Sequence, residues 1–181
     1  MHISHNASSD SDVPAVVIFG CGNGLLGDDG FGPAVIEQLQ RSTLPPSVRA
    51  VDVGTSIREQ LLDYLLLPTA RPQLLVVVDA GLEADGTPGE VRRCRPQDLA
   101  QRKIHDFSLH QFPTVNLLAE LQAETGIEVV LLLAQVANLP EQVAPGLSPV
   151  MRVEVDAACA HNDRLVAPYV PFSTTVEATS P

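Results

Sequence analysis

The chain has few of the features that would direct it to a nucleic acid or into a membrane. Its 181 residues include 11 lysines and arginines against 22 aspartates and glutamates, a net charge of −11. It contains no run of basic residues, which argues against nucleic acid as a partner. No apolar stretch approaches the length that spans a bilayer, and residues 1–13 lack the regions of a signal peptide. We therefore expect a cytoplasmic protein without nucleic-acid or membrane partners.

Cysteine and histidine are also scarce. Cys21, Cys94 and Cys159 are far apart, with neither the spacing of a zinc site nor the even count of a disulfide framework. Cys21 lies in a glycine-rich loop and has two interpretations, a nucleophile or a small residue in a tight turn, of which we favour the second. Of five histidines, only His105 and His110 lie inside the part expected to fold.

Residues 16–33 organise the rest of the chain. They begin with four apolar residues without alternation, as in a parallel strand that is covered on both faces. Then come four glycines, two acids and a proline that suits a first helical turn: Gly20, Gly22, Gly24, Gly27, Asp28, Asp29 and Pro33. A helix is expected from there to about residue 40. The loop therefore delivers two carboxylates to the carboxyl end of the first strand, where open α/β sheets bind ligands.

The same loop also matches a nucleotide-binding pattern. Residues 22–27 read G-x-G-x-x-G, and Asp52 is the candidate ribose acid. A pyrophosphate needs bare N–H groups at a helix N-terminus, whereas Asp28 and Asp29 stand where its negative charge would lie. Because paired carboxylates suit a cation better, nucleotide binding is kept only as an alternative.

Strand-like and helix-like segments alternate along the chain. Strands are expected at 48–53, 74–79, 90–94 and 127–135, and helices at 56–67, 96–102, 114–125 and 148–160. Ser56, Thr114 and Ser148 are expected to cap helices, Ser56 in a capping box with Glu59. This alternation predicts a three-layer α/β fold, an open, mostly parallel twisted sheet with helices on both faces. One domain spans residues 14–160, with loose tails at 1–13 and 161–181.

Two acids follow apolar strands at what is predicted to be one edge of the sheet. Asp79 closes the third strand, and parallel strands share their carboxyl edge, so Asp79 should lie near Asp29. An alternative is that Asp79 caps a turn by bonding nearby N–H groups. Two carboxylates and one loop imidazole, from His105 or His110, suit a divalent transition metal with open positions.

Several motifs in order give a more specific indication. The sequence contains Gly20-Cys21-Gly22-Asn23, Asp28-Asp29-Gly30-Phe31-Gly32, Asp52-Val53-Gly54-Thr55, Val78-Asp79-Ala80, Ser108-Leu109-His110-Gln111 and Gly146-Leu147-Ser148. Over residues 16–160 the chain resembles the hydrogenase maturation endopeptidases. These remove the C-terminal extension of the large subunit of nickel–iron hydrogenases after nickel insertion. The run at 106–113 resembles the branch that serves coenzyme F420-reducing hydrogenases.

The resemblance implies roles for individual residues. Asp29, Asp79 and His110, rather than His105, match the family's metal-binding residues and would be the catalytic set. Leu109 departs from the family, since many relatives have proline there. The resemblance also implies that Gly22, Asn23, Gly54, Thr55 and Gln111 bind the substrate. Asp28 is expected to serve the helix start instead.

The resemblance further implies that the protease holds no nickel tightly. The nickel is carried by the hydrogenase large-subunit precursor, which is the expected partner, and the protease is expected to be a monomer. Either a nickel-polarised water or carbonyl, or a carboxylate that acts as general base, would assist hydrolysis. A non-proteolytic checkpoint that binds the nickel-loaded precursor without cutting it is a further alternative.

Overall fold

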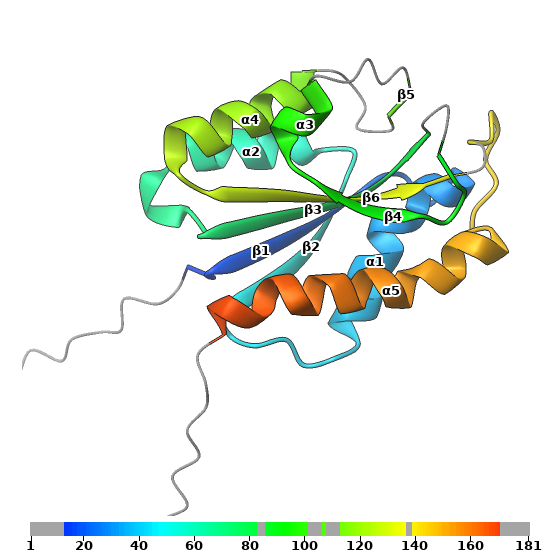
Figure 1. Ribbon diagram of the computed structural model, residues 1–181, viewed down its shortest axis with the longest axis horizontal. Helices are drawn as coiled ribbons and strands as arrows, with labels where there is room; N and C mark the ends of the chain where they lie inside the picture. Colours follow the sequence, from blue (N-terminus) through cyan, green and yellow to red (C-terminus); the bar gives the residue numbers. More distant parts are fainter. Residues whose placement is uncertain (1–12, 83–85, 101–105, 108–112, 137–138, 171–181) are drawn as a thin grey trace, which may run out of the picture.

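The computed structural model describes residues 13–82, 86–100, 106–107, 113–136 and 139–170 (Figure 1). The described strands are β1 (Val16–Cys21), β2 (Val48–Gly54), β3 (Leu74–Leu82), β4 (Val91–Cys94), β5 (Asp106–Phe107) and β6 (Glu128–Gln135). The described α-helices are α1 (Phe31–Gln40), α2 (Ile57–Leu66), α3 (Pro96–Ala100), α4 (Pro113–Thr125) and α5 (Pro149–Val166). Short 3₁₀ turns cover Gly27–Gly30, Pro68–Ala70 and Ala167–Tyr169.

The strands form one mostly parallel sheet in the order β2-β1-β3-β6-β4. β1 pairs in parallel with β2 and β3, and β3 pairs in parallel with β6. β4 is an antiparallel edge strand on β6, and β5 pairs antiparallel with the end of β3. The predicted fold class is confirmed, including the short strand at 91–94.

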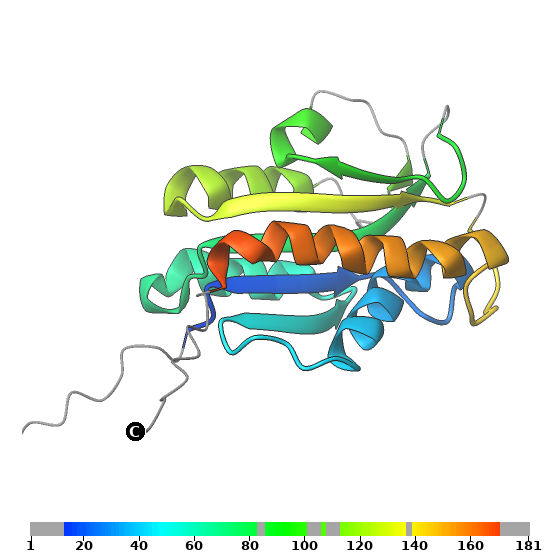
Figure 2. The same cartoon turned by 60° about the horizontal axis from the view of Figure 1, so that its bottom comes forward.

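Helices cover both faces of this sheet. Helices α1 and α5 lie on one face, and α2, α3 and α4 lie on the other (Figures 1 and 2). Alternate residues of β1 serve the two layers, because Val16 and Ile18 pack toward α1 and α5, while Val17 and Phe19 pack toward α2 and α4. Both faces of the central strands are buried, which explains why their sequences are apolar without alternation. No described helix is long and apolar enough to cross a membrane.

The first turn of helix α1 contacts the sheet closely because two glycines face each other. A Cβ atom on Gly32, in the first turn of α1, would collide with backbone atoms of Cys21 and Val78. A Cβ atom on Gly20 would collide with the side chain of Ile36 and the backbone of Gly32. The start of α1 is therefore pressed against the point where β1 ends.

The predicted end of one strand and the predicted end of one helix are wrong. β3 continues past Asp79 to Leu82, because β6 still pairs with it as far as Gly81 and β5 pairs with Gly81 and Leu82, although the pairing of β1 with β3 has stopped at Val78. Helix α5 continues past residue 160 to Val166. Asn162 and Val166 are buried on its inner face.

Of the three predicted helix caps, one is confirmed and two are wrong. Ser148 caps α5 as predicted, and its hydroxyl accepts a bond from the Met151 N–H at 3.4 Å. The capping box at Ser56 is wrong, since Ser56 donates its N–H to the Val53 carbonyl in a turn and its side chain makes no capping bond. Helix α4 begins at Pro113, so Thr114 lies inside the first turn instead of capping it.

The close approach of α1 gives a stability prediction. Replacing Gly32 with alanine is expected to destabilise the fold by about 3 kcal/mol, because overpacking a rigid backbone contact costs this much. Gly24→Ala is the matched control, since a Cβ there meets no atom within 4 Å. Urea unfolding measures both. A Gly32→Ala variant as stable as Gly24→Ala would contradict the close contact.

Candidate functional site

The carboxyl ends of β1 and β2 are joined by their glycines. The Gly22 N–H donates to the Gly54 carbonyl at 3.0 Å. Both residues have positive φ, +121° and +51°, a backbone conformation that favours glycine. This bond brings four predicted substrate-binding residues to one place: Gly22, Asn23, Gly54 and Thr55. Thr55 is exposed there.

Asp29 lies on the 3₁₀ turn Gly27–Gly30 and folds back over the glycine loop. Its side chain is 1% exposed, and its Oδ2 accepts the Asn23 N–H at 2.8 Å. Asn23 in turn accepts the Leu25 N–H through its side-chain oxygen at 3.0 Å. A Cβ on Gly22 would collide with the Asp29 carbonyl and lie 3.6 Å from its Cγ. The loop therefore holds this carboxylate directly above the end of β1.

Asp79 is fully buried inside β3. It follows Val78, the last residue of β3 that pairs with β1, so it occupies the point where the two strands separate. Its Oδ1 accepts the N–H of the next residue, Ala80, at 2.8 Å. Its carboxylate thus bonds a neighbouring N–H, as the alternative interpretation expects, although Asp79 lies within a strand and not in a turn.

The thiol of Cys21 is buried at the same sheet edge, at the end of β1. Burial raises the pKa of this thiol well above its usual value. The negative charge of Asp79 raises that pKa further, and so do those of Asp52 and Asp29. One buried sulfur therefore lies among acids that come from β2, β3 and the glycine loop. The predicted juxtaposition of Asp29 with Asp79 is consistent with this arrangement, and a buried neutral thiol supports the structural role of Cys21.

Asp28 ties the loop to another part of the chain. It is buried, and its Oδ1 accepts the Ser148 N–H at 2.6 Å, at the start of α5. Asp28 lies at a helix start as predicted, in the first turn of the 3₁₀ helix Gly27–Gly30, and its carboxylate also bonds the start of a second helix, α5. Nearby, Gly27 donates its N–H to the Ala144 carbonyl at 2.8 Å, and the Ala144 N–H donates to Leu25 at 2.9 Å.

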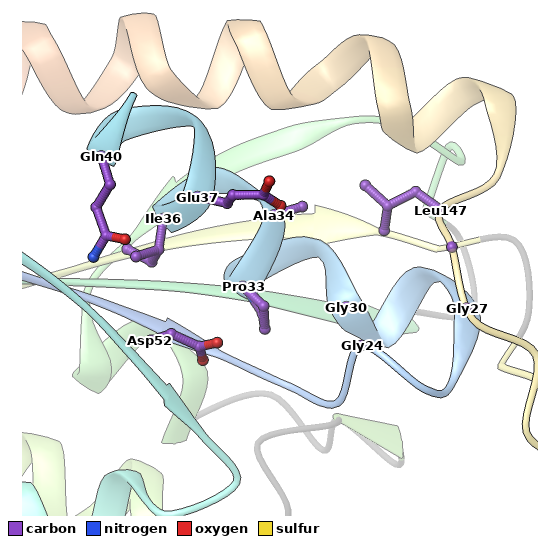
Figure 3. Close-up of a pocket in the computed structure, with 11 residues that line it drawn as sticks. Gly24, Gly27, Gly30, Pro33, Ala34, Ile36, Glu37, Gln40, Asp52 and Leu147 are labelled. Carbon is purple, nitrogen blue, oxygen red and sulfur yellow. The ribbon is translucent and has the colours of Figure 1, made fainter. Parts of the chain in front are cut away.

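A cavity of about 450 Å³ opens beside the loop, on the α1 face of the sheet. Figure 3 shows the glycine loop, the start of α1, Asp52 and Leu147 around it. The sequence offers Asp52 as a candidate ribose acid and as the first residue of the motif Asp52-Val53-Gly54-Thr55. The structure places it at the end of β2, where its Oδ1 accepts the Gly54 N–H at 2.9 Å. Its place in this motif is the sequence signal that predicts Asp52 beside Gly54 and Thr55.

The predicted histidine lies outside the described residues, as do Gln111 and His105. The described residues on either side of the predicted histidine are Phe107 and Pro113, where α4 begins. Phe107 pairs with Gly81, which is two residues beyond Asp79. Within the described ranges, no group of three histidine, cysteine, aspartate or glutamate residues could hold a metal ion. The described part of the site therefore comprises two buried carboxylates at one sheet edge, a glycine loop and an adjacent cavity.

Comparison with known proteins identifies the family. The hydrogenase maturation protease family model matches residues 33–161. The hydrogenase 2 maturation protease of Escherichia coli is 30% identical over 146 residues, which cover 79% of this chain and 85% of the relative. The coenzyme F420 hydrogenase subunit delta of Methanothermobacter thermautotrophicus is 27% identical over 147 residues, 79% of this chain and 89% of the relative. The solved structure of the E. coli hydrogenase maturating endopeptidase HybD superposes with a TM-score of 0.65 at 27% identity, covering 85% of this chain and 93% of that one.

The environment of Cys21 gives a chemical prediction. Because its pKa is raised, its thiolate fraction at pH 8 is lower than that of an ordinary cysteine, and each pKa unit lowers that fraction about tenfold. We expect iodoacetamide at pH 8 to alkylate Cys21 at least about tenfold more slowly in the folded protein than in urea. Peptide mass mapping measures the rate. Equal rates in the two conditions would show that the thiol is neither buried nor surrounded by negative charge.

Proposed function

The chain belongs to the hydrogenase maturation protease family, and we propose that it removes the C-terminal extension of a nickel–iron hydrogenase large-subunit precursor after nickel insertion. Members of this family are peptidases, so the reaction is hydrolysis of a peptide bond. The observation that supports a site at the described sheet edge is the pair of buried carboxylates, Asp29 and Asp79, beside Cys21.

We propose that the nickel ion belongs to the substrate. Asp29, Asp79 and His110 would complete the coordination of the nickel already held by the precursor. Carboxylate and imidazole ligands suit a divalent transition metal, and three of them leave positions open for groups of the substrate. The chain order supports the set, because His110 is three residues from Phe107, and Phe107 pairs next to the end of β3.

The loop residues would place the precursor chain over this edge. Gly22 and Gly54 hold the ends of β1 and β2 together, and Asn23 fixes Asp29 through its N–H. Together with Thr55 and Gln111 they would line the path of the substrate. Hydrolysis also needs a group that takes a proton from the attacking water, and a carboxylate of the pair is this chain's own candidate for that role.

The monomeric state and the cytoplasmic location of this protein stay predictions, and both rest on the sequence only. The same holds for the precise partner, although a relative named as a coenzyme F420 hydrogenase subunit is among the similar proteins.

Conservative variants test the site. In Asp29→Asn the amide oxygen can still accept the Asn23 N–H, so the loop should keep its shape while the negative charge is lost. We expect Asp29→Asn, Asp79→Asn and His110→Ala each to lower processing of nickel-loaded precursor about a hundredfold, as loss of a metal-binding interaction does. Mass spectrometry of the precursor measures the rate, and circular dichroism checks folding.

A matched control separates the site from general effects of charge. Asp63, which is exposed on α2, is changed to asparagine in the same way and should leave processing unchanged. If all three site variants process the precursor as fast as Asp63→Asn does, the assignment of Asp29, Asp79 and His110 is wrong.

A further inference from the structure

The cavity beside the glycine loop adjoins the carboxylate pair but does not include it. It is lined by eleven residues of α1, β2, the loop and the segment before α5 (Figure 3). Neither Asp29 nor Asp79 is among them. Asp79 belongs to the face of β3 that packs with Leu75 and Val77 toward α2 and α4, whereas the cavity lies on the α1 side. Its volume of about 450 Å³ is that of a site for one bulky group.

The polar lining of the cavity is acidic. Its polar side chains belong to Asp52, Glu37 and Gln40, and none of the eleven lining residues is a lysine, arginine or histidine. Glu37 contacts Arg41 at 2.7 Å, but both side chains are about two-thirds exposed or more, at 70% and 66%. Such a surface pair contributes little and is readily exchanged for another partner. The cavity therefore complements a positively charged group.

The cavity is continuous with the proposed site. Gly27 and Gly30, which line it, are the first and last residues of the turn that carries Asp29. Asp52, an exposed residue that also lines the cavity, accepts the N–H of Gly54, whose carbonyl accepts the N–H of Gly22 in the loop. A polypeptide that crosses the sheet edge at Asp29 therefore reaches the cavity within a few residues.

The lining also leaves room for a side chain from outside. A Cβ atom on Gly24 or Gly146 would meet no protein atom within 4 Å. Pro33, Ala34 and Leu147 supply apolar surface for the aliphatic part of a long side chain. An acidic end and an apolar wall are the surroundings that lysine and arginine side chains prefer.

We propose that this cavity binds a positively charged side chain of the hydrogenase large-subunit precursor and so contributes to its recognition. The proposal rests on the proposed function, because it takes the occupant to be part of the chain that is cut. It assigns Glu37 and Asp52 to substrate binding, and it gives Gly24 the role of keeping the cavity open.

Charge reversal tests the electrostatic part. We expect Glu37→Lys to lower kcat/KM for nickel-loaded precursor about tenfold, mainly through KM, which corresponds to about 1.4 kcal/mol of binding. Asp63→Lys on α2 makes the same change in net charge on the other face of the sheet, and should stay within about twofold of the unmodified protein. An equal loss in both variants would assign the effect to net charge and overturn the proposal.

Filling the cavity tests the steric part. The φ angle of Gly24 is not positive, and a Cβ atom added to it would meet no protein atom within 4 Å. Gly24→Leu should therefore fold with an unchanged melting temperature. We expect it to raise KM about tenfold, because its side chain takes space that the substrate needs. Normal KM values in both Gly24→Leu and Glu37→Lys would overturn the proposal.

The outcome for the cavity is distinguishable from that for the proposed function. If Glu37→Lys and Gly24→Leu process the precursor normally while Asp29→Asn does not, the function stands and the cavity proposal fails. If the unmodified protein does not cut the precursor, the function fails. In that case titration calorimetry measures how tightly each variant binds the nickel-loaded precursor. The cavity proposal then requires that Glu37→Lys weakens binding about tenfold and that Asp63→Lys does not.

Discussion

The close contact between the first turn of α1 and the end of β1 determines where the acids lie. Gly20 and Gly32 allow backbone to meet backbone, and no side chain fits between them. The turn Gly27–Gly30 must then pass over the sheet edge before α1 begins, and it carries Asp29 with it. Gly22 has no side chain, so the Asp29 carboxylate can lie above it and accept the Asn23 N–H. The position of the site thus follows from the absence of side chains at three glycines.

The same edge concentrates negative charge where proteins normally avoid it. Asp28, Asp29 and Asp79 are all buried, and burial of a carboxylate costs free energy unless it is hydrogen-bonded or paired with positive charge. Asp28 accepts the Ser148 N–H, a bond that also fixes the start of α5 beside the loop. A nickel-loaded substrate would add positive charge beside Asp29 and Asp79, and a lysine or arginine in the adjacent cavity would add it beside Glu37 and Asp52. Both proposals thus describe one property, an acidic edge built to receive a cationic part of the substrate.

The sequence predicts the sheet and its acids well because both depend on local signals. Apolar runs without alternation mark the buried strands, and the order of the chain places Asp29 and Asp79 at one edge. Contacts between distant segments carry no such signal, so the bonds of Gly27 and Leu25 with Ala144 were not foreseen. The end of α5 was missed because polar residues follow residue 160, and nothing in the sequence shows that Asn162 is buried with its amide bonded to the Ala158 carbonyl. The histidine of the predicted set lies outside the described residues, and its place rests on the resemblance alone.

The most direct test of substrate-borne nickel is to incubate the protein with its large-subunit precursor, with and without nickel, and to weigh the products by mass spectrometry. Loss of a short C-terminal peptide from the nickel-loaded precursor alone is the predicted result. Cleavage irrespective of nickel would contradict the role of Asp29, Asp79 and His110 as ligands of substrate nickel. Nickel-dependent binding without loss of mass would instead show a checkpoint protein that does not cut.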